Sequence, residues 1–239
     1  MRYLILSDIH GNLEALTSVL ADAKGRYDSI LNCGDLVGYG PDPNAVVEWC
    51  RANTPVLIRG NHDKACVGLQ DLEWFNPVAR KSAVWTSEVL TEQNREFLRD
   101  LPKGPRAVDD FQLVHGSPQD EDEYLVSREE AQNAAQFVDR AISFFGHTHV
   151  QGGFILHRNG VRYVTTQRLA LDRDVAYLLN PGSVGQPRDE DPRAGYLIYS
   201  PEERFVEFFR VEYDVMRTQQ KILQAGLPEL LAYRLQFGK

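Results

Sequence analysis

Five short polar clusters hold nearly all of the histidine in this chain of 239 residues. In chain order they read Asp8-Ile9-His10, Gly34-Asp35, Gly60-Asn61-His62-Asp63, His115-Gly116 and Gly146-His147-Thr148-His149. Five of the six histidines lie in these clusters, and only His157 does not. Histidines with separate structural roles would be scattered along the chain, so this distribution indicates that the clusters form one site.

The side chains that the clusters offer are typical ligands of metal ions. Imidazole, carboxylate and amide groups together suit Mn²⁺, iron, Zn²⁺, Co²⁺ or Ni²⁺. Leaving His62 and Asp63 aside, the set contains two carboxylates, four histidines and one amide, which is more than one ion needs. Two ions that share a bridging carboxylate fit it better. Such a pair, about 3.5–4 Å apart, can stabilise both the attacking and the leaving oxygen of a phosphoryl displacement.

Each cluster follows a segment that is typical of a buried strand. These segments are Tyr3–Ser7, Ser29–Asn32, Pro55–Ile58, Gln112–Val114 and Ile142–Phe145. Helical patterns begin at Asn12 and at Pro43, between the first strands. This alternation predicts parallel strands with right-handed crossovers. Ligands of such sheets bind at the carboxyl ends of the strands, where the clusters lie.

The pattern changes along the rest of the chain. We expect two helices over Pro77–Leu90 and Thr91–Leu101. After Gly153 the expected strands are Phe154–His157, Arg162–Thr166 and Val175–Leu179, followed by a hairpin of Tyr196–Tyr199 and Arg204–Val211. Between them, Arg168–Arg173 is expected to be a solvated face. Together the elements predict an α/β fold, a four-layer α-β-β-α sandwich in which two mixed β-sheets pack face to face with helices outside.

We expect one domain over residues 1–239, since this length suits a single α/β unit. Helices at about 214–237, interrupted near Gly226-Leu227-Pro228, carry apolar residues at helical spacing. We favour their packing on the domain. The alternative is a partner surface that would form a homo-oligomer.

The net charge of −8 argues against general binding of nucleic acid, which requires a basic face. It does not exclude a phosphate substrate, because bound divalent cations can reverse the local charge.

Cys33, Cys50 and Cys66 have irregular spacing, which predicts neither a zinc site nor a disulfide framework. The apolar N-terminal segment Met1–Leu6 is too short for a signal sequence or a membrane span. We therefore expect a cytoplasmic protein with no membrane partner.

The five clusters, in this order and spacing, resemble the motifs of the calcineurin-like metallophosphoesterase superfamily. The resemblance covers roughly Met1 to Pro192. With Asp8–Asn12 and Asn180–Arg188 included, the pattern is similar to the small bacterial and archaeal phosphodiesterase group of that superfamily, the YfcE-like enzymes.

The resemblance implies a division of the ligands between two ions. The first ion would take Asp8, His10 and His149, the second would take Asn61, His115 and His147, and Asp35 would bridge them. A bridging water or hydroxide would be the nucleophile. We expect Mn²⁺, with iron, Zn²⁺, Co²⁺ or Ni²⁺ as alternatives.

The resemblance also places His62 beside the leaving oxygen, as a general acid or a stabiliser of the phosphate oxygens. Asp63 would orient the His62 imidazole. Two plainer interpretations stay open at this point. His62 could lie outside the reacting groups, and an aspartate at a helix start such as Asp63 could cap the helix instead.

Two further residues, Asn12 and Arg188, are candidate substrate-binding residues. Asn12 could reach a phosphate oxygen, although it also suits the N-cap of a helix. Arg188 could bind a phosphate through two nitrogens, although it could instead pair with Asp189-Glu190-Asp191. Tyr39, between two glycines, could line the cleft or simply pack in a turn.

We therefore expect a hydrolase of a small phosphodiester or phosphomonoester. One alternative is a catalytically silent binding or scaffold protein with this fold, but such a protein would be expected to lack metal ligands. A nuclease is the other alternative, and it would require a basic strand-binding surface.

Overall fold

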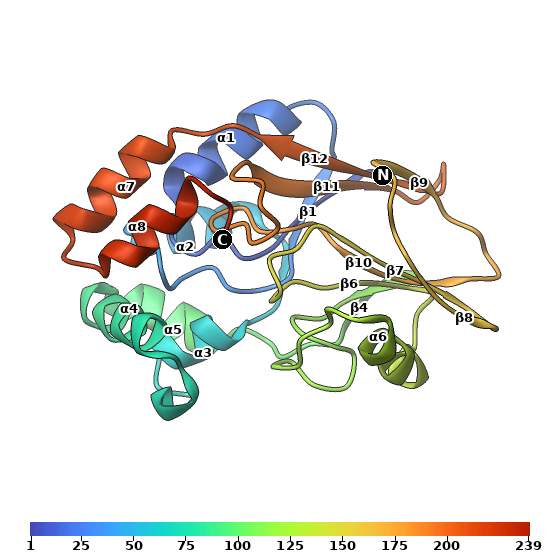
Figure 1. Ribbon diagram of the computed structural model, residues 1–239, viewed down its shortest axis with the longest axis horizontal. Helices are drawn as coiled ribbons and strands as arrows, with labels where there is room; N and C mark the ends of the chain where they lie inside the picture. Colours follow the sequence, from blue (N-terminus) through green and yellow to red (C-terminus); the bar gives the residue numbers. More distant parts are fainter.

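Two six-stranded sheets, packed face to face, form the centre of the molecule (Figure 1). The computed structural model describes all residues, Met1–Lys239. In order across the first sheet, the strands are β3 (Val56–Leu57), β2 (Ser29–Asn32), β1 (Tyr3–Leu6), β11 (Ala194–Ser200), β12 (Phe205–Val211) and β9 (Arg168–Ala170). In order across the second sheet, they are β4 (Arg106–Val108), β5 (Phe111–Leu113), β6 (Ile142–Phe144), β10 (Ala176–Asn180), β7 (Gly152–His157) and β8 (Gly160–Tyr163). Both sheets contain parallel and antiparallel neighbours, which confirms the expected mixed sheets.

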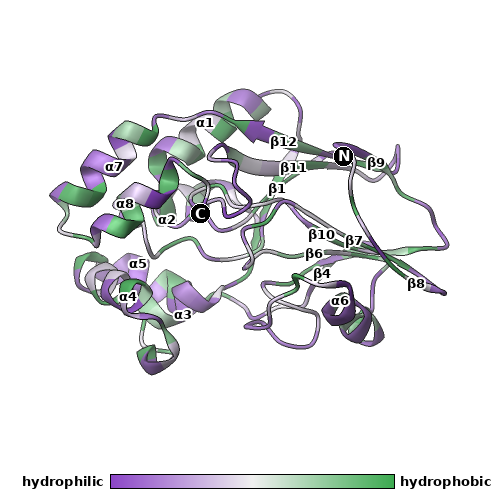
Figure 2. Ribbon diagram, viewed as in Figure 1, coloured by the Kyte–Doolittle hydropathy of each residue, from purple (hydrophilic) through white to green (hydrophobic).

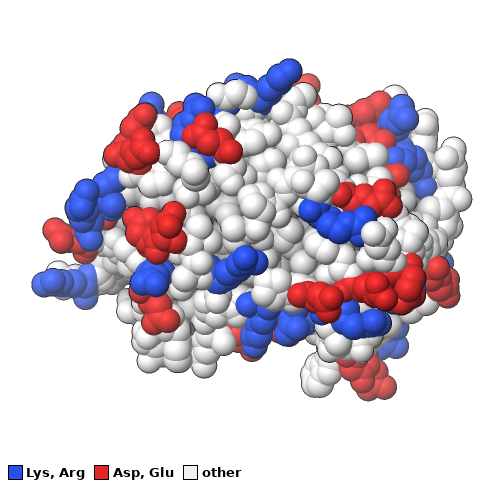
Figure 3. Space-filling view, turned by 180° about the vertical axis from the view of Figure 1, so that it is seen from behind, with Lys and Arg blue, Asp and Glu red and all other residues white.

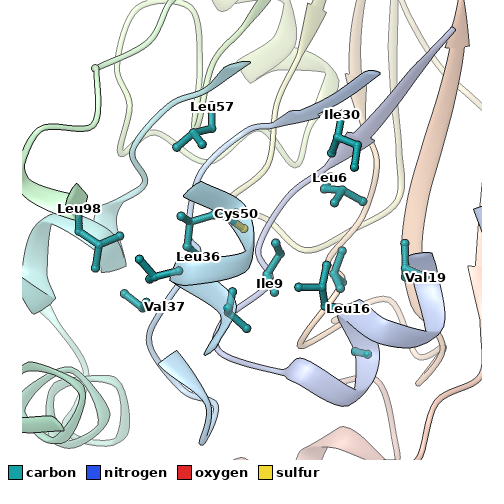
Figure 4. Packing of buried hydrophobic residues seen from close by; sticks show 14 of the residues in the cluster. Leu6, Ile9, Leu16, Val19, Ile30, Leu36, Val37, Cys50, Leu57 and Leu98 are labelled. Carbon is teal, nitrogen blue, oxygen red and sulfur yellow. The ribbon is translucent and has the colours of Figure 1, made fainter. Parts of the chain in front are cut away.

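Strand β1 shows how the first sheet separates two apolar layers. Successive side chains of a strand point to opposite faces. Tyr3 and Ile5 therefore lie in the core between the sheets. Leu4 and Leu6 pack on the other face, against helices α1 (Leu13–Ala23) and α2 (Pro43–Asn53). Figure 4 shows side chains of this outer cluster gathered between strands and helices.

The second sheet separates two layers in the same way. Tyr177 and Leu179 of β10 belong to the core between the sheets, whereas Leu178 packs in an outer cluster with Ala131 and Ala134. Those alanines belong to helix α6 (Arg128–Ala134), which the short 3₁₀ turn η2 (Ala135–Phe137) follows. The result is the expected four-layer α-β-β-α sandwich.

The remaining helices lie beside the sheets at one end of the molecule (Figure 1). They are α3 (Asn61–Cys66), the 3₁₀ turn η1 (Leu72–Trp74), α4 (Pro77–Val89), α5 (Glu92–Arg99), α7 (Val215–Gln224) and α8 (Glu229–Leu235). None of the helices combines the length and apolar character that crossing a membrane requires.

The C-terminal helices α7 and α8 bury part of their apolar surface within the chain. Ile222 and Leu231 belong to a buried cluster that also contains Tyr39 and Ala79. The Lys221 ammonium binds Glu14 at 2.9 Å and also contacts Asp42, which ties α7 to the start of α1 and α2. Figure 2 shows hydrophobic and hydrophilic residues on both helices. These contacts support packing on the rest of the chain, the favoured alternative.

Strands β4 and β9 and helix α6 were not anticipated, and strand β8 is shifted. Strands β4 and β9 are short and lie at sheet edges, and polar residues interrupt their apolar pattern. Strand β9 falls within Arg168–Arg173, so the expectation of a purely solvated face is corrected there. Helix α6 buries only alanines and therefore lacks a clear apolar period. Strand β8 begins at Gly160, earlier than expected, because Gly160 pairs with His157 across a tight turn.

Replacing Gly153 by alanine tests the close packing of β7 on β10. A Cβ atom there would lie 2.1 Å from the Leu178 carbonyl oxygen, at a φ of +136°. Gly160→Ala is a matched control, because Gly160 has a φ of +138° but open space around its Cβ position. In urea denaturation, we expect Gly153→Ala to lower the free energy of unfolding by about 1–3 kcal/mol more than the control does. Equal losses in the two variants would contradict the close contact.

Candidate metal centre

The carboxyl ends of parallel strands from both sheets meet at one site. Strands β1, β2 and β3 precede Asp8, His10, Asp35 and Asn61, while β5 and β6 precede His115, His147 and His149. Two groups of potential ligands form there, each with its ligand atoms within 4.8 Å of one another. The first contains Asp8, His10, Asp35 and His149, and the second contains Asp35, His115 and His147. Asp35 is common to both, as a bridging carboxylate must be.

Five of these candidate ligands have a left-handed backbone conformation. The φ angles are +52° at Asp8, +49° at His10, +56° at Asp35, +66° at His147 and +60° at His149. They account for five of the nine residues other than glycine with positive φ in the chain. Such conformations are unfavourable for residues with a Cβ atom and tend to occur at functional sites. The structure therefore concentrates backbone strain at the strand ends that carry the candidate ligands.

Each of the two histidines of the first group leaves one ring nitrogen, Nε2, available to bind a metal ion. Each uses Nδ1–H to donate to a backbone carbonyl, from His10 to Val37 at 2.9 Å and from His149 to Gln186 at 2.6 Å. Burial holds the pKa of both imidazoles well below the usual value, so both are neutral and their Nε2 atoms are acceptors. Those two Nε2 atoms lie 3.1 Å apart. Two lone pairs facing each other at this distance favour a cation between them.

The second group contains a buried oxygen, Asp35 Oδ2, that accepts no hydrogen bond. His115 donates from Nδ1 to the Cys33 carbonyl (2.8 Å), which directs Nε2 toward Asn61 Oδ1 at 3.1 Å and Asp35 Oδ2 at 3.4 Å. Burial alone would lower the pKa of His115, but the Asp35 charge outweighs it and raises the pKa to about 10. A bound cation would take the place of that proton.

His147 completes the second group. Its Nε2 donates to the Asp122 carbonyl at 3.2 Å, which leaves Nδ1 as the free ligand atom. Burial lowers its pKa to about 3, so the ring is neutral. Its backbone N–H donates to the Asp8 carboxylate at 3.1 Å and so links the two groups. The neutral imidazoles of His10, His147 and His149 thus converge with carboxylate oxygens, as divalent cations require.

His62 lies beside the ligands but belongs to neither group. It is 4% exposed, and its Nδ1 is buried without a partner. Burial lowers its pKa to about 4. Its backbone N–H donates to Asp35 Oδ1 at 2.8 Å, so this residue also holds the shared carboxylate in place.

Asp63 does not have the role that we expected. Its carboxylate accepts four backbone N–H groups, those of Gly60, Asp35, Leu36 and Val37, at 2.9–3.2 Å. It therefore caps α3 and fixes the turn that carries Asp35. The expectation that it orients the His62 imidazole is corrected, because both oxygens are engaged with the backbone.

Asn12 is engaged in a similar way. Its Oδ1 accepts from Ala15 N–H and from the Thr218 hydroxyl, both at 3.1 Å, and its Nδ2 donates to the Gly185 carbonyl at 2.9 Å. With 1% of its surface exposed, it serves as the N-cap of α1. These contacts support the cap and not the substrate contact that we considered.

Arg188 is available to a ligand. The acidic run that follows it is engaged elsewhere, Asp189 with Arg210 and Asp191 with Arg193. The Arg188 side chain is only partly exposed, contacts the Gln186 amide oxygen at 3.0 Å, and has no carboxylate partner. Its charge is one cause of the lowered pKa values of the neighbouring histidines, after their burial.

Tyr39 belongs to the site, although the sequence left its role open. Its ring centroid lies 4.7 Å from that of His10 and 4.3 Å from that of His62. The flanking glycines were the available signal. A Cβ at Gly38 would lie 2.5 Å from His62 Nδ1, and one at Gly40 would lie 2.1 Å from the His10 carbonyl oxygen. Only glycine lets this turn approach both histidines so closely.

An asparagine at position 63 tests the structural role of Asp63. Asp63→Asn replaces one acceptor oxygen by an NH₂ group, so two buried N–H groups lose their acceptor, at about 1–3 kcal/mol each. In urea denaturation, we expect the free energy of unfolding to fall by about 2–6 kcal/mol. Asp71→Asn, at an exposed cap where asparagine serves equally, is the control and should change little. An unchanged unfolding curve for Asp63→Asn would contradict this role.

Comparison with known proteins agrees with this geometry. The model of the calcineurin-like phosphoesterase superfamily domain matches residues 1–204. The uncharacterized protein MJ0912 of Methanocaldococcus jannaschii is 36% identical over an alignment 250 positions long, which covers 98% of this chain and 97% of that protein. A metallophosphoesterase structure from Sphaerobacter thermophilus is 41% identical, with a TM-score of 0.88 and coverage of 100% and 99% of the two chains. The hypothetical protein PH1004 from Pyrococcus horikoshii OT3, 22% identical, shares the fold, with a TM-score of 0.81 and coverage of 100% and 98%. This chain therefore belongs to the calcineurin-like phosphoesterase superfamily.

Proposed function

We propose that this protein is a dinuclear-metal-dependent phosphoesterase that hydrolyses a phosphodiester or phosphomonoester of a small molecule. The family and fold are those of metallophosphoesterases. The observation that carries the proposal is the pair of ligand groups joined at Asp35. The facing Nε2 atoms of His10 and His149 support it further, as does Asp35 Oδ2, a buried oxygen that accepts no hydrogen bond.

The proposed ligands are divided as the family resemblance implies. Asp8, His10 and His149 would hold one ion, Asn61, His115 and His147 the other, and Asp35 would contact both. We propose Mn²⁺ for the site, with iron, Zn²⁺, Co²⁺ or Ni²⁺ as alternatives that the same ligands accept. When bound, such ions lower the pKa of water and neutralise phosphate charge, which supplies a nucleophile at neutral pH.

Two side chains of the protein would act on the substrate directly. Arg188, which has no carboxylate partner, would bind phosphate oxygens through its guanidinium. His62 is neutral in the free site because burial lowers its pKa to about 4. The negative charge of a bound phosphate would favour its protonated form. His62 would then donate its proton to the leaving oxygen as a general acid.

The two alternatives are less well supported. A degenerate scaffold protein would be expected to lack ligands, whereas all seven expected ligand residues are present here. For a nuclease, the net charge of −8 is unfavourable. Figure 3 shows acidic and basic side chains interspersed over one face of the molecule. The three cysteines are free and buried, which is consistent with the proposed cytoplasmic location.

Hydrolysis of bis-p-nitrophenyl phosphate tests the proposal. We expect turnover with added Mn²⁺, loss of turnover after chelation, and recovery when Mn²⁺ is restored. Asp35→Asn should lower both the turnover, by about a hundredfold or more, and the Mn²⁺ content of the purified protein, since stabilisation by the metals is worth several kcal/mol. Asp110→Asn, at an exposed turn, is the matched control. If no metal produced any chelator-sensitive turnover, the proposal would fail.

The role of His62 can be separated from metal binding. His62→Ala removes the imidazole but keeps the backbone N–H that holds Asp35. We expect kcat to fall by about 10²–10⁴-fold while the bound metal, measured by elemental analysis, stays unchanged. His157→Ala, at an exposed strand end, should alter neither quantity. Loss of metal from His62→Ala would show that this histidine is a ligand and would overturn the assignment.

A further inference from the structure

A cavity of about 230 Å³ opens directly beside the metal centre. Asn61, His62 and His147 form the part of its wall that belongs to the centre. Because His62 is the proposed proton donor to the leaving oxygen, the cavity lies where the leaving group of the substrate would extend. The rest of its wall therefore bears on which leaving group the protein accepts.

Aromatic rings form much of the remaining wall. Trp74, on η1, is 87% exposed although it is one of the largest apolar side chains in the chain. Tyr124 is 48% exposed, and its ring centroid lies 4.0 Å from that of His147. Phe75 lies edge-on to His62, with their ring centroids 5.0 Å apart. Packing within the protein does not explain an exposed tryptophan at the mouth of a cavity, whereas stacking on a ligand would.

The wall of the cavity also carries polar groups that can form hydrogen bonds. Gln70 Oε1 and His62 Nδ1 are buried and have no partner. No lysine or arginine lines the cavity. The carboxylate of Asp122, which does line it, is bound by the Lys64 ammonium at 2.8 Å. A second phosphate or a carboxylate in this cavity would thus meet no lysine or arginine, while a neutral group with a hydrogen-bond donor would find an acceptor in Gln70 Oε1.

We propose that the leaving group of the substrate is a neutral aromatic or heteroaromatic ring that stacks on Trp74. This inference rests on the proposed function. The cavity volume falls below the roughly 300–1,000 Å³ typical of pockets for whole drug-sized ligands, which suits one ring-bearing unit and not a polymer. The phosphate would stay at the metal centre, near Arg188, and the ring would extend toward Trp74 and Tyr124.

The inference is tested by measuring, with titration calorimetry, the affinities of two phosphonates for the Mn²⁺-loaded protein. Benzylphosphonate carries a ring and methylphosphonate does not, and neither can lose its organic group by hydrolysis. We expect benzylphosphonate to bind more tightly. Trp74→Ala should weaken benzylphosphonate about two- to tenfold and leave methylphosphonate unchanged, as expected for the loss of one aromatic contact.

Two further variants make the result specific. Trp74→Phe should retain most of the preference, because it keeps a ring at this position. Phe137→Ala removes an exposed aromatic side chain on η2, outside the lining of this cavity, and should have no effect. Equal affinity for the two phosphonates, or equal weakening of both in Trp74→Ala, would overturn the inference even with metal-dependent hydrolysis intact. Absence of metal-dependent hydrolysis would instead overturn the proposed function, and the leaving-group assignment with it.

Discussion

The site depends on one buried carboxylate, Asp35, which lies at the junction of the two sheets and has no lysine or arginine paired with it. A buried charge is unfavourable unless other groups compensate it. Here the compensation comes from both sheets, through the His62 N–H on Oδ1 and the His115 ring beside Oδ2. Asp63 fixes the turn that carries Asp35. Because both ligand groups contain Asp35, the ends of the two sheets must meet within reach of a single side chain.

That requirement explains the unusual backbone of the site. The strand ends approach so closely that a Cβ at Gly60 would lie 2.1 Å from Asp35 Oδ1, and one at Gly146 would lie 1.9 Å from the Ser7 hydroxyl oxygen. Five of the seven candidate ligands take left-handed conformations. The strain is tolerated because two large apolar clusters, one between the sheets and one outside the first sheet, hold the strands in place.

Much of this arrangement was predictable from the sequence, because apolar strand segments and the polar clusters after them are both local patterns. The two mixed sheets and the meeting of the polar clusters at one site follow from those patterns. Elements without an apolar period, such as α6 and the edge strand β9, were not predictable. Nor were the contacts of Asp63, since an aspartate that orients a ring and one that binds a turn look alike in the sequence. Tyr124 contacts His147 because its loop is held by ion pairs of Glu121 and Asp122 with Lys64, a residue far away in the sequence.

One of those ion pairs links the centre to the cavity beside it. Lys64 lies in the six-residue helix α3, three residues after Asn61, and its ammonium binds both Asp122 and Glu121. The same short helix therefore carries a proposed metal ligand, Asn61, and the anchor of the loop that holds Tyr124. A change within α3 would alter reactivity and selectivity together, whereas the exposed Trp74 can vary alone. In the divergence of proteins with this architecture, new specificities would therefore arise more readily at η1 than at α3.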